Sequence, residues 1–122
     1  LFENITLFQQ GYDEASVRKA LKALCLSDWA EALPQGLMTP LGEGGQSLSQ
    51  GQRKRLGLAR ALVQDRPLIL LDEPTCGLDH ETARALLTNL FAKVKKTGQT
   101  LLVITHEREI LKDFPQVIEL KK

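Results

Sequence analysis

Two acidic residues directly follow an apolar run in this sequence. Residues 68–71 are Leu-Ile-Leu-Leu, and Asp72 and Glu73 come next. Such a run predicts a buried strand, and open α/β sheets bind ligands at the edge where their strands end. There Asp72 could meet a hydrated Mg²⁺ on a nucleotide, and Glu73 could polarise a water for attack on the terminal phosphate. Because acids after an apolar run are also common in solvated loops, the neighbouring motifs must decide.

A histidine stands at the end of a second apolar run. His106 directly follows the predicted strand over residues 101–105. Adjacent parallel strands would bring it to the same edge as Asp72 and Glu73, where a neutral imidazole can bond a phosphate oxygen or position water. An isolated histidine is more often a structural cap, but its convergence with two acids favours a catalytic role.

The stretch LSQGQRKRLGLARAL, residues 48–62, predicts a helix whose first turn could hold a phosphate. Ser49 and Gln52 have the spacing of a capping box, which predicts Ser49 as the N-cap of a helix over residues 49–64. Gly51 has no side chain to shield the first amides, and unpaired amides at a helix N-terminus attract anionic oxygens. The alternative is an ordinary capped helix, since most capping boxes bind nothing.

Two regions must position these residues. Residues 1–47 are predicted to form a helical unit and a loop, and residues 48–122 the helix that begins at Ser49 and the later part of an α/β core. In the first region an apolar stripe predicts a helix over residues 13–26, Ser27 is expected to cap a short helix over 27–33, and residues 42–45 read as an ordered turn. The stripe comprises Val17, Ala20, Leu21, Leu24 and Cys25.

The second region predicts helices alternating with buried strands. We expect a helix over residues 80–96 ended by Gly98, a short helix from Glu107 and a third strand over residues 117–120. The runs LILL and LLVI are apolar on both faces, which predicts a parallel sheet covered on both sides. The fold class is therefore α/β.

In this order the motifs resemble the later part of the ATP-binding domain of ABC transporters, a P-loop NTPase-like cassette. Residues 48–52 resemble its signature motif, 68–72 its Walker B strand, and 77–79 its D-loop. The resemblance covers nearly all 122 residues, and Gln50 departs from the commonest signature, which has glycine there. In that family two cassettes enclose two ATP molecules.

The resemblance implies a role for each site residue. Glu73 and His106 would be catalytic, with Glu73 acting on the attacking water and His106 on the γ-phosphate, while Asp72 would serve Mg²⁺. The resemblance implies that four residues contact a nucleotide or the interface between the two cassettes. These residues are Ser49, Gly51, Gln52 and Asp79. ATP and Mg²⁺ are thus the implied cofactors, and a second nucleotide-binding domain is an implied partner.

One family motif is absent from the printed sequence. No GxxxxGK[ST] occurs among the residues, so we expect a cassette fragment that lacks the Walker A portion. We expect such a fragment neither to bind ATP tightly nor to hydrolyse it alone. The missing phosphate-loop strand should also leave one edge of the sheet uncovered.

Two further stretches resemble exporter-type cassettes. Residues 39–45, TPLGEGG, resemble the element ahead of the signature that touches transmembrane coupling helices, and residues 3–5, ENI, resemble a segment after the family's Q-loop. GEGG with DEPTxGLD is similar to thiol exporters of cytochrome bd assembly. The resemblance implies ATP-driven export, a transmembrane domain as partner, and a place on the cytoplasmic side of a membrane. For residues 42–45 the alternative is simple chain reversal.

Composition and spacing weigh against other classes. With 122 residues, 43% hydrophobic, 25% charged and a net charge of +1, the chain suits one globular domain rather than a disordered or polyanion-binding one. Arg53, Lys54 and Arg55 read as a solvated face, so no nucleic acid is expected. A zinc site from the two cysteines and two histidines lacks paired short spacings, and Cys25 and Cys76 are expected as reduced thiols.

Two alternatives within the ATPase class stay open. An SMC-like chromosome or DNA-repair ATPase has the same motifs, but it places a long coiled coil ahead of the signature, where about forty ordinary residues stand here. A regulatory cassette that does not hydrolyse ATP is the second alternative, and Glu73 and His106 argue against it.

Overall fold

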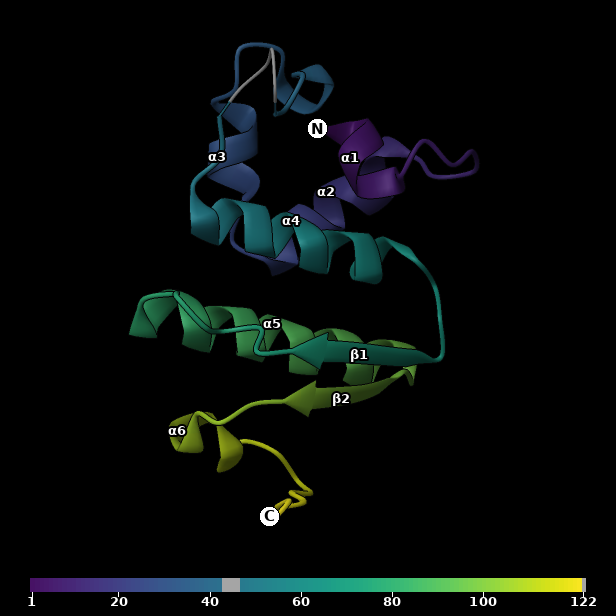
Figure 1. The fold of residues 1–122 in the computed structure, drawn as a ribbon. Coiled ribbons are helices and arrows are strands. Elements are labelled where there is room, and N and C mark those ends of the chain that lie inside the picture. Colours follow the sequence, from purple (N-terminus) through teal and green to yellow (C-terminus); the bar gives the residue numbers. More distant parts are fainter. Residues whose placement is uncertain (43–46, 122) are drawn as a thin grey trace.

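The computed structural model describes residues 1–42 and 47–121 and shows an α/β arrangement in two tiers (Figure 1). The upper tier is helical, and the lower tier holds two strands with helices beside them. The elements in chain order are α1 (Phe2–Thr6), α2 (Glu14–Ala23), α3 (Ser27–Glu31), the 3₁₀ helix η1 (Gly36–Met38), α4 (Gln50–Val63), β1 (Leu68–Asp72), α5 (His80–Thr97), β2 (Thr100–Ile104) and α6 (Arg108–Leu111). The turn predicted for residues 42–45 lies mostly outside the described residues.

The first helices follow the predicted apolar stripe with two differences. Asp13 caps α2 by accepting from the Ser16 amide, and Val17, Ala20 and Leu21 are buried. The helix stops at Ala23, and Cys25 has φ 59°, so its side chain leaves the stripe and is exposed. The prediction that Ser27 caps α3 is wrong, because Leu26 is the N-cap and no side-chain bond closes that end.

Helix α4 joins the two tiers. It packs against α1 and α2 on one side and against β1 on the other. Leu56, Ala59 and Leu62 are buried along it, in a core that also includes Ile69 and Leu71 of β1. The second half of α4 is thus buried between the two tiers through its apolar face.

The parallel sheet is confirmed, with β1 and β2 as its strands. The register pairs Leu68 with Thr100 and Asp72 with Ile104, so both strands end at the same edge. Helix α5 makes the crossover between them. It ends at Gly98, whose φ of 74° allows the left-handed cap and whose amide donates to the Val94 carbonyl.

One face of the sheet differs from the prediction. Ile69 and Leu71 are buried, but Leu68 and Leu70 are 53% and 56% exposed, so β1 is covered on one side only. The alternation along β2 is similar, with Leu102 and Ile104 on the exposed face. Within the described part of the chain, the second layer that LILL and LLVI require is not formed.

The third predicted strand, over residues 117–120, is also wrong, since the chain there is irregular and Leu120 is 92% exposed. A strand forms only when a neighbour completes its hydrogen bonds, and within residues 1–42 and 47–121 the sheet consists of β1 and β2. No helix among these residues has the length and apolar character that crossing a bilayer requires.

Candidate functional site

Glu73 turns sharply out of β1 toward the end of β2. Its amide continues the ladder by donating to the Ile104 carbonyl at 2.8 Å. Its φ is then 48°, a left-handed conformation that non-glycine residues seldom adopt and that recurs at functional sites. This turn breaks the strand alternation and directs the side chain across the sheet edge.

Three donors from the end of β2 hold the Glu73 carboxylate. Oε1 accepts from the His106 amide at 3.1 Å and lies 2.5 Å from His106 Nδ1. Oε2 accepts from the Thr105 hydroxyl at 3.2 Å. The His106 ring hydrogen bond is the main cause that lowers the pKa of Glu73 below its usual value, although partial desolvation opposes it.

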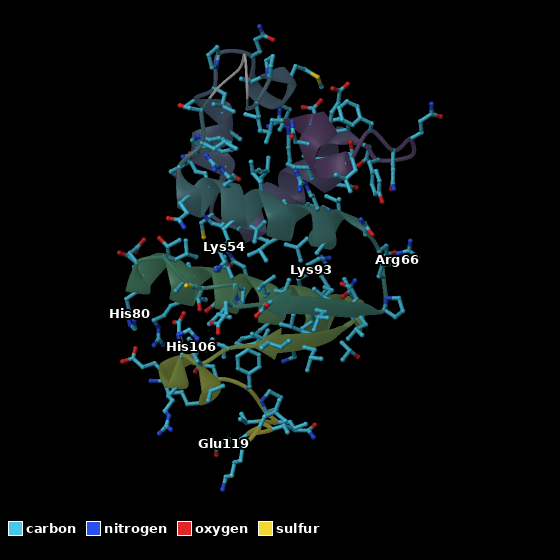
Figure 2. All side chains as sticks on the ribbon, in the orientation of Figure 1. Lys54, Arg66, His80, Lys93, His106 and Glu119 are labelled. Carbon is cyan, nitrogen blue, oxygen red and sulfur yellow. The ribbon has the colours of Figure 1, made fainter. Side chains whose placement is uncertain are left out.

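The contact also fixes the proton on the histidine ring. An ionised carboxylate only accepts, so His106 Nδ1 must carry the shared proton, and Nε2 is left free to face solvent. The His106 side chain is 80% exposed, compared with 26% for Glu73. Figure 2 shows His106 between the end of β2 and α6, at the same end of the sheet as His80 of α5. A ligand can therefore reach His106 without displacing the glutamate.

Three residues that the sequence analysis did not identify extend this contact. The Thr105 hydroxyl oxygen accepts from the Glu107 amide at 3.0 Å, and the Glu107 carboxylate accepts from the Thr75 hydroxyl at 3.1 Å. Thr75 is 2% exposed. Their only sequence signal is that they flank the motif residues, in the orders Glu73-Pro74-Thr75 and Thr105-His106-Glu107.

Asp72 ends β1 with an exposed carboxylate. Among residues 1–42 and 47–121 there is no group of three His, Cys, Asp or Glu side chains that could hold a metal ion. A single exposed carboxylate such as that of Asp72 could supply one ligand of a metal site. That fits Mg²⁺, which commonly takes one or two carboxylates and completes its shell with water and substrate phosphate.

The start of α4 has the predicted capping box. The Ser49 hydroxyl accepts from the Gln52 amide at 3.1 Å, and the Gln52 side chain accepts from the Ser49 amide at 2.9 Å. The first helical bond runs from the Arg53 amide to the Ser49 carbonyl. The Gln50 and Gly51 amides precede that bond and are the helix donors that a bound anion can use. Ser49 and Gln50 are exposed, so an anion can approach them.

The D-loop residues lie beside this turn. A Cβ placed on Gly51 would lie 3.6 Å from Leu78 Cδ2. Asp79 is the N-cap of α5 and accepts from the Thr82 amide at 2.9 Å; this hydrogen bond is the main cause that lowers the pKa of Asp79. The start of α5 thus follows directly in the chain after Leu78, the residue that borders Gly51.

The basic run after the signature contacts backbone carbonyls. Arg53 donates to the Leu48 carbonyl at 3.4 Å and Lys54 to the Cys76 carbonyl at 3.4 Å. Arg55 donates to the carbonyls of Gly51, Leu24 and Cys25. Figure 2 places Lys54 between α4 and α5.

The predicted site residues form two groups. Glu73 and His106 are in direct contact, with Asp72 one residue away along the chain. Ser49, Gly51 and Gln52 share one turn, and Asp79 follows Leu78, which lies 3.6 Å from where a Cβ on Gly51 would be. No hydrogen bond within the described residues joins the first group to the second. The chemical roles of all seven residues stay predictions.

Comparison with known proteins identifies the family. The family model described as "ABC transporter" matches residues 1–76, and a model described as an AAA domain matches residues 46–112. The first match covers more than half of the chain and includes the signature turn and Glu73.

Individual relatives agree with the family match. The chain is 44% identical over 106 residues, 87% of its length, to the glutathione/L-cysteine transport system ATP-binding/permease protein CydD of Bacillus subtilis. It is 36% identical over 126 aligned residues, 98% of its length, to the ATP-dependent lipid A-core flippase of Bordetella avium. It spans 18% of the first relative and 21% of the second, about a fifth of each.

A solved structure shows the same fold. A bacterial Atm1-family ABC exporter with ATP bound superimposes with a TM-score of 0.78 at 35% identity, over 91% of this chain and 19% of that one. Together with the ordered motifs and the paired ends of β1 and β2, these matches show that the chain belongs to the ABC transporter family and forms part of its ATP-binding cassette.

Proposed function

We propose that this chain is the signature-bearing part of an ATP-hydrolysing domain that drives export across a membrane. The observation that carries the proposal is the contact between Glu73 and His106 at the carboxyl edge of a parallel sheet, with 2.5 Å between Oε1 and Nδ1. A base whose lowered pKa keeps it ionised, next to an exposed imidazole, suits the activation of water beside a phosphate.

The reaction is hydrolysis of the terminal phosphate of ATP. Glu73 accepts a proton from water as the water oxygen bonds to the terminal phosphorus. The bond between that phosphorus and the bridging oxygen breaks, and ADP and phosphate leave. His106 contacts the terminal phosphate through Nε2, the ring nitrogen that the Glu73 contact leaves free. A hydrogen bond donated from Nε2 while Nδ1 stays bonded to Glu73 requires the doubly protonated ring.

Asp72 would hold Mg²⁺, which would supply charge neutralisation at the phosphate oxygens. The exposed carboxylate at the end of β1 supports this assignment. The Gln50 and Gly51 amides, with the Ser49 hydroxyl and Gln52, would bind the terminal phosphate of a nucleotide held mainly by another cassette. Asp79, at the neighbouring start of α5, would take part in communication between the two cassettes.

We propose a second cassette and a transmembrane domain as partners. The separation of the site residues into two groups supports the first, because each group could complete a different nucleotide site. The second is supported by the relatives named as an ATP-binding/permease protein and a flippase, and by the similar exporter structure. A transmembrane partner would place this domain at the cytoplasmic face of the membrane. The division at residues 47 and 48 into a helical unit and a core also remains a proposal.

Substitution of Glu73 in the full-length protein tests the function. Glu73→Gln keeps the size and the hydrogen-bond acceptor but removes the base, so we expect ATP turnover to fall by about 100-fold or more. Nucleotide binding should persist, which equilibrium binding of a fluorescent ATP analogue can measure. Unchanged turnover in Glu73→Gln would overturn the proposal.

A further inference from the structure

The hydroxyl of Thr105 bridges the Glu73 carboxylate and the backbone after β2. Its oxygen accepts from the Glu107 amide at 3.0 Å and lies 3.2 Å from Glu73 Oε2. An amide can only donate and an ionised carboxylate can only accept, so the direction of both bonds is fixed. The hydroxyl proton of Thr105 must therefore point at Glu73, held there by the amide behind it.

A second link fastens the same two turns. The buried Thr75 hydroxyl donates to Glu107 Oε1 at 3.1 Å. The turn after β1 and the turn after β2 are thus joined by two threonine hydroxyls, one donating from each side. Of the two, Thr105 touches the carboxylate itself, whereas Thr75 acts on Glu107.

The Glu73 carboxylate needs such support. Glutamate has three rotatable side-chain bonds, and the left-handed φ of 48° places this one in an uncommon backbone conformation. His106 holds only Oε1, through its amide and its ring. The bond from Thr105 holds the other oxygen, Oε2, so both ends of the carboxylate are fixed.

We propose that Thr105 is a positioning residue for the hydrolysis of ATP, acting by orienting Glu73 through Oε2. This inference rests on the proposed function. Thr105 acts on the glutamate and not on the nucleotide, so its hydroxyl should influence the chemical step and leave nucleotide affinity unchanged. A threonine that served only to stabilise the fold would affect the amount of folded protein instead.

Four variants of the full-length protein test the inference. Thr105→Val removes the hydroxyl at nearly constant shape, Thr105→Ser keeps it, and Thr88→Val makes the same exchange at an exposed position of α5. We expect Thr105→Val to lower kcat about tenfold, the loss typical of one hydrogen bond to a charged group, with the KM for ATP and nucleotide binding unchanged. Thr105→Ser and Thr88→Val should retain wild-type kcat. Thr105→Ala repeats the test without the second methyl group of valine.

A double-mutant cycle shows whether the effect passes through Glu73. In single-turnover measurements, Thr105→Val should slow a Glu73→Gln protein by less than about twofold, because the base that Thr105 orients is already gone. An equal slowing in both backgrounds would overturn the inference, as would a Thr105→Ser variant as slow as Thr105→Val.

The outcomes also separate this inference from the proposed function. If Glu73→Gln abolishes turnover while Thr105→Val retains full kcat, the positioning role is wrong and the hydrolytic function stands. If Glu73→Gln itself leaves turnover unchanged, the proposed function fails.

Discussion

At the scale of single residues, the ionisation of Glu73 depends on its neighbours more than on its own exposure. The donors at Oε1 and Oε2 all favour the charged carboxylate, and the His106 ring is the main cause of its lowered pKa. A base held in its charged form at neutral pH is ready to accept a proton, but every bond that lowers its pKa also weakens it as a base. The Glu73 and His106 contact therefore fits the proposed site in its state before a nucleotide binds.

Removal of the His106 ring should raise the pKa of Glu73 toward its ordinary value of 4.5, since the Thr105 hydroxyl and the backbone amide remain. We expect this in His106→Ala, measured by NMR titration of isotope-labelled glutamate carboxyl groups. A carboxyl with a lowered pKa in the folded state contributes stability above its ordinary pKa and loses it as the pH falls through the folded value.

The free energy of unfolding of the wild-type chain should accordingly drop more, from neutral pH to below 4.5, than that of His106→Ala. His80→Ala is the matched control, because His80 is exposed and lies 3.9 Å from Glu109 rather than near Glu73. An unchanged Glu73 pKa in His106→Ala would contradict the assigned cause.

At the scale of helices and strands, the two tiers are held together at the end of α2. Helix α2 stops at Ala23, and its last carbonyls need donors from elsewhere. Arg55 of α4 donates to the carbonyls of Leu24 and Cys25, and Asn89 of α5 donates to that of Ala23 at 3.0 Å. The helical tier is thus fastened to the core by side chains that cap another helix.

Asn89→Ala should loosen this attachment. The loss of one partly buried hydrogen bond predicts a fall of about 1 kcal/mol in the free energy of unfolding, measured with urea. Amide hydrogen exchange near the end of α2 should accelerate. Exchange of the β1 amides should change only as far as the free energy of unfolding changes. Thr88→Ala, at the exposed neighbouring position, should change neither quantity. Equal stability of Asn89→Ala and wild type would mean that water replaces the amide at no cost.

The sequence was sufficient for elements whose own residues determine them. The Ser49 capping box, the helix that ends at Gly98, and the two apolar runs all predicted local structure that is present. The strand over residues 117–120 was wrong because strand formation depends on a neighbour, which a local apolar pattern cannot specify. Ser27 failed as a cap because the chain enters the helix one residue earlier.

The site was predictable only in part for the same reason. Parallel strand ends predicted that His106 would come near Glu73, and the β1 and β2 register brings them into contact. The link through Thr105 depends on the left-handed turn at Glu73, and no residue type in the sequence signals that turn. Long-range bonds such as those of Arg55 and Asn89 join segments that only the packed fold brings together.

At the scale of the whole molecule, the separation of the site residues into two groups is consistent with the proposed second cassette. The exposed start of α4 makes no hydrogen bond to Glu73 or His106 among the described residues. If both groups close on one triphosphate from opposite cassettes, damage to the α4 start must slow hydrolysis without weakening the fold. Glycine substitutions in α4 can separate these two effects.

Gly51→Ala should stabilise the domain yet impair the transporter. The added Cβ would lie 3.6 Å from Leu78 Cδ2 and 3.9 Å from Arg55 Nη2, which is ordinary contact, so the fold accepts it. Replacing glycine by alanine in a helix raises the free energy of unfolding by up to about 1 kcal/mol. The same methyl group lies beside the amides proposed to bind phosphate, so ATP turnover of the full-length protein should fall about tenfold or more.

Gly57→Ala is the matched control, because that glycine is in the same helix and a Cβ there meets nothing within 4 Å. Both variants should gain stability, and only Gly51→Ala should lose turnover; equal turnover in the two would mean that the α4 start does not take part in hydrolysis.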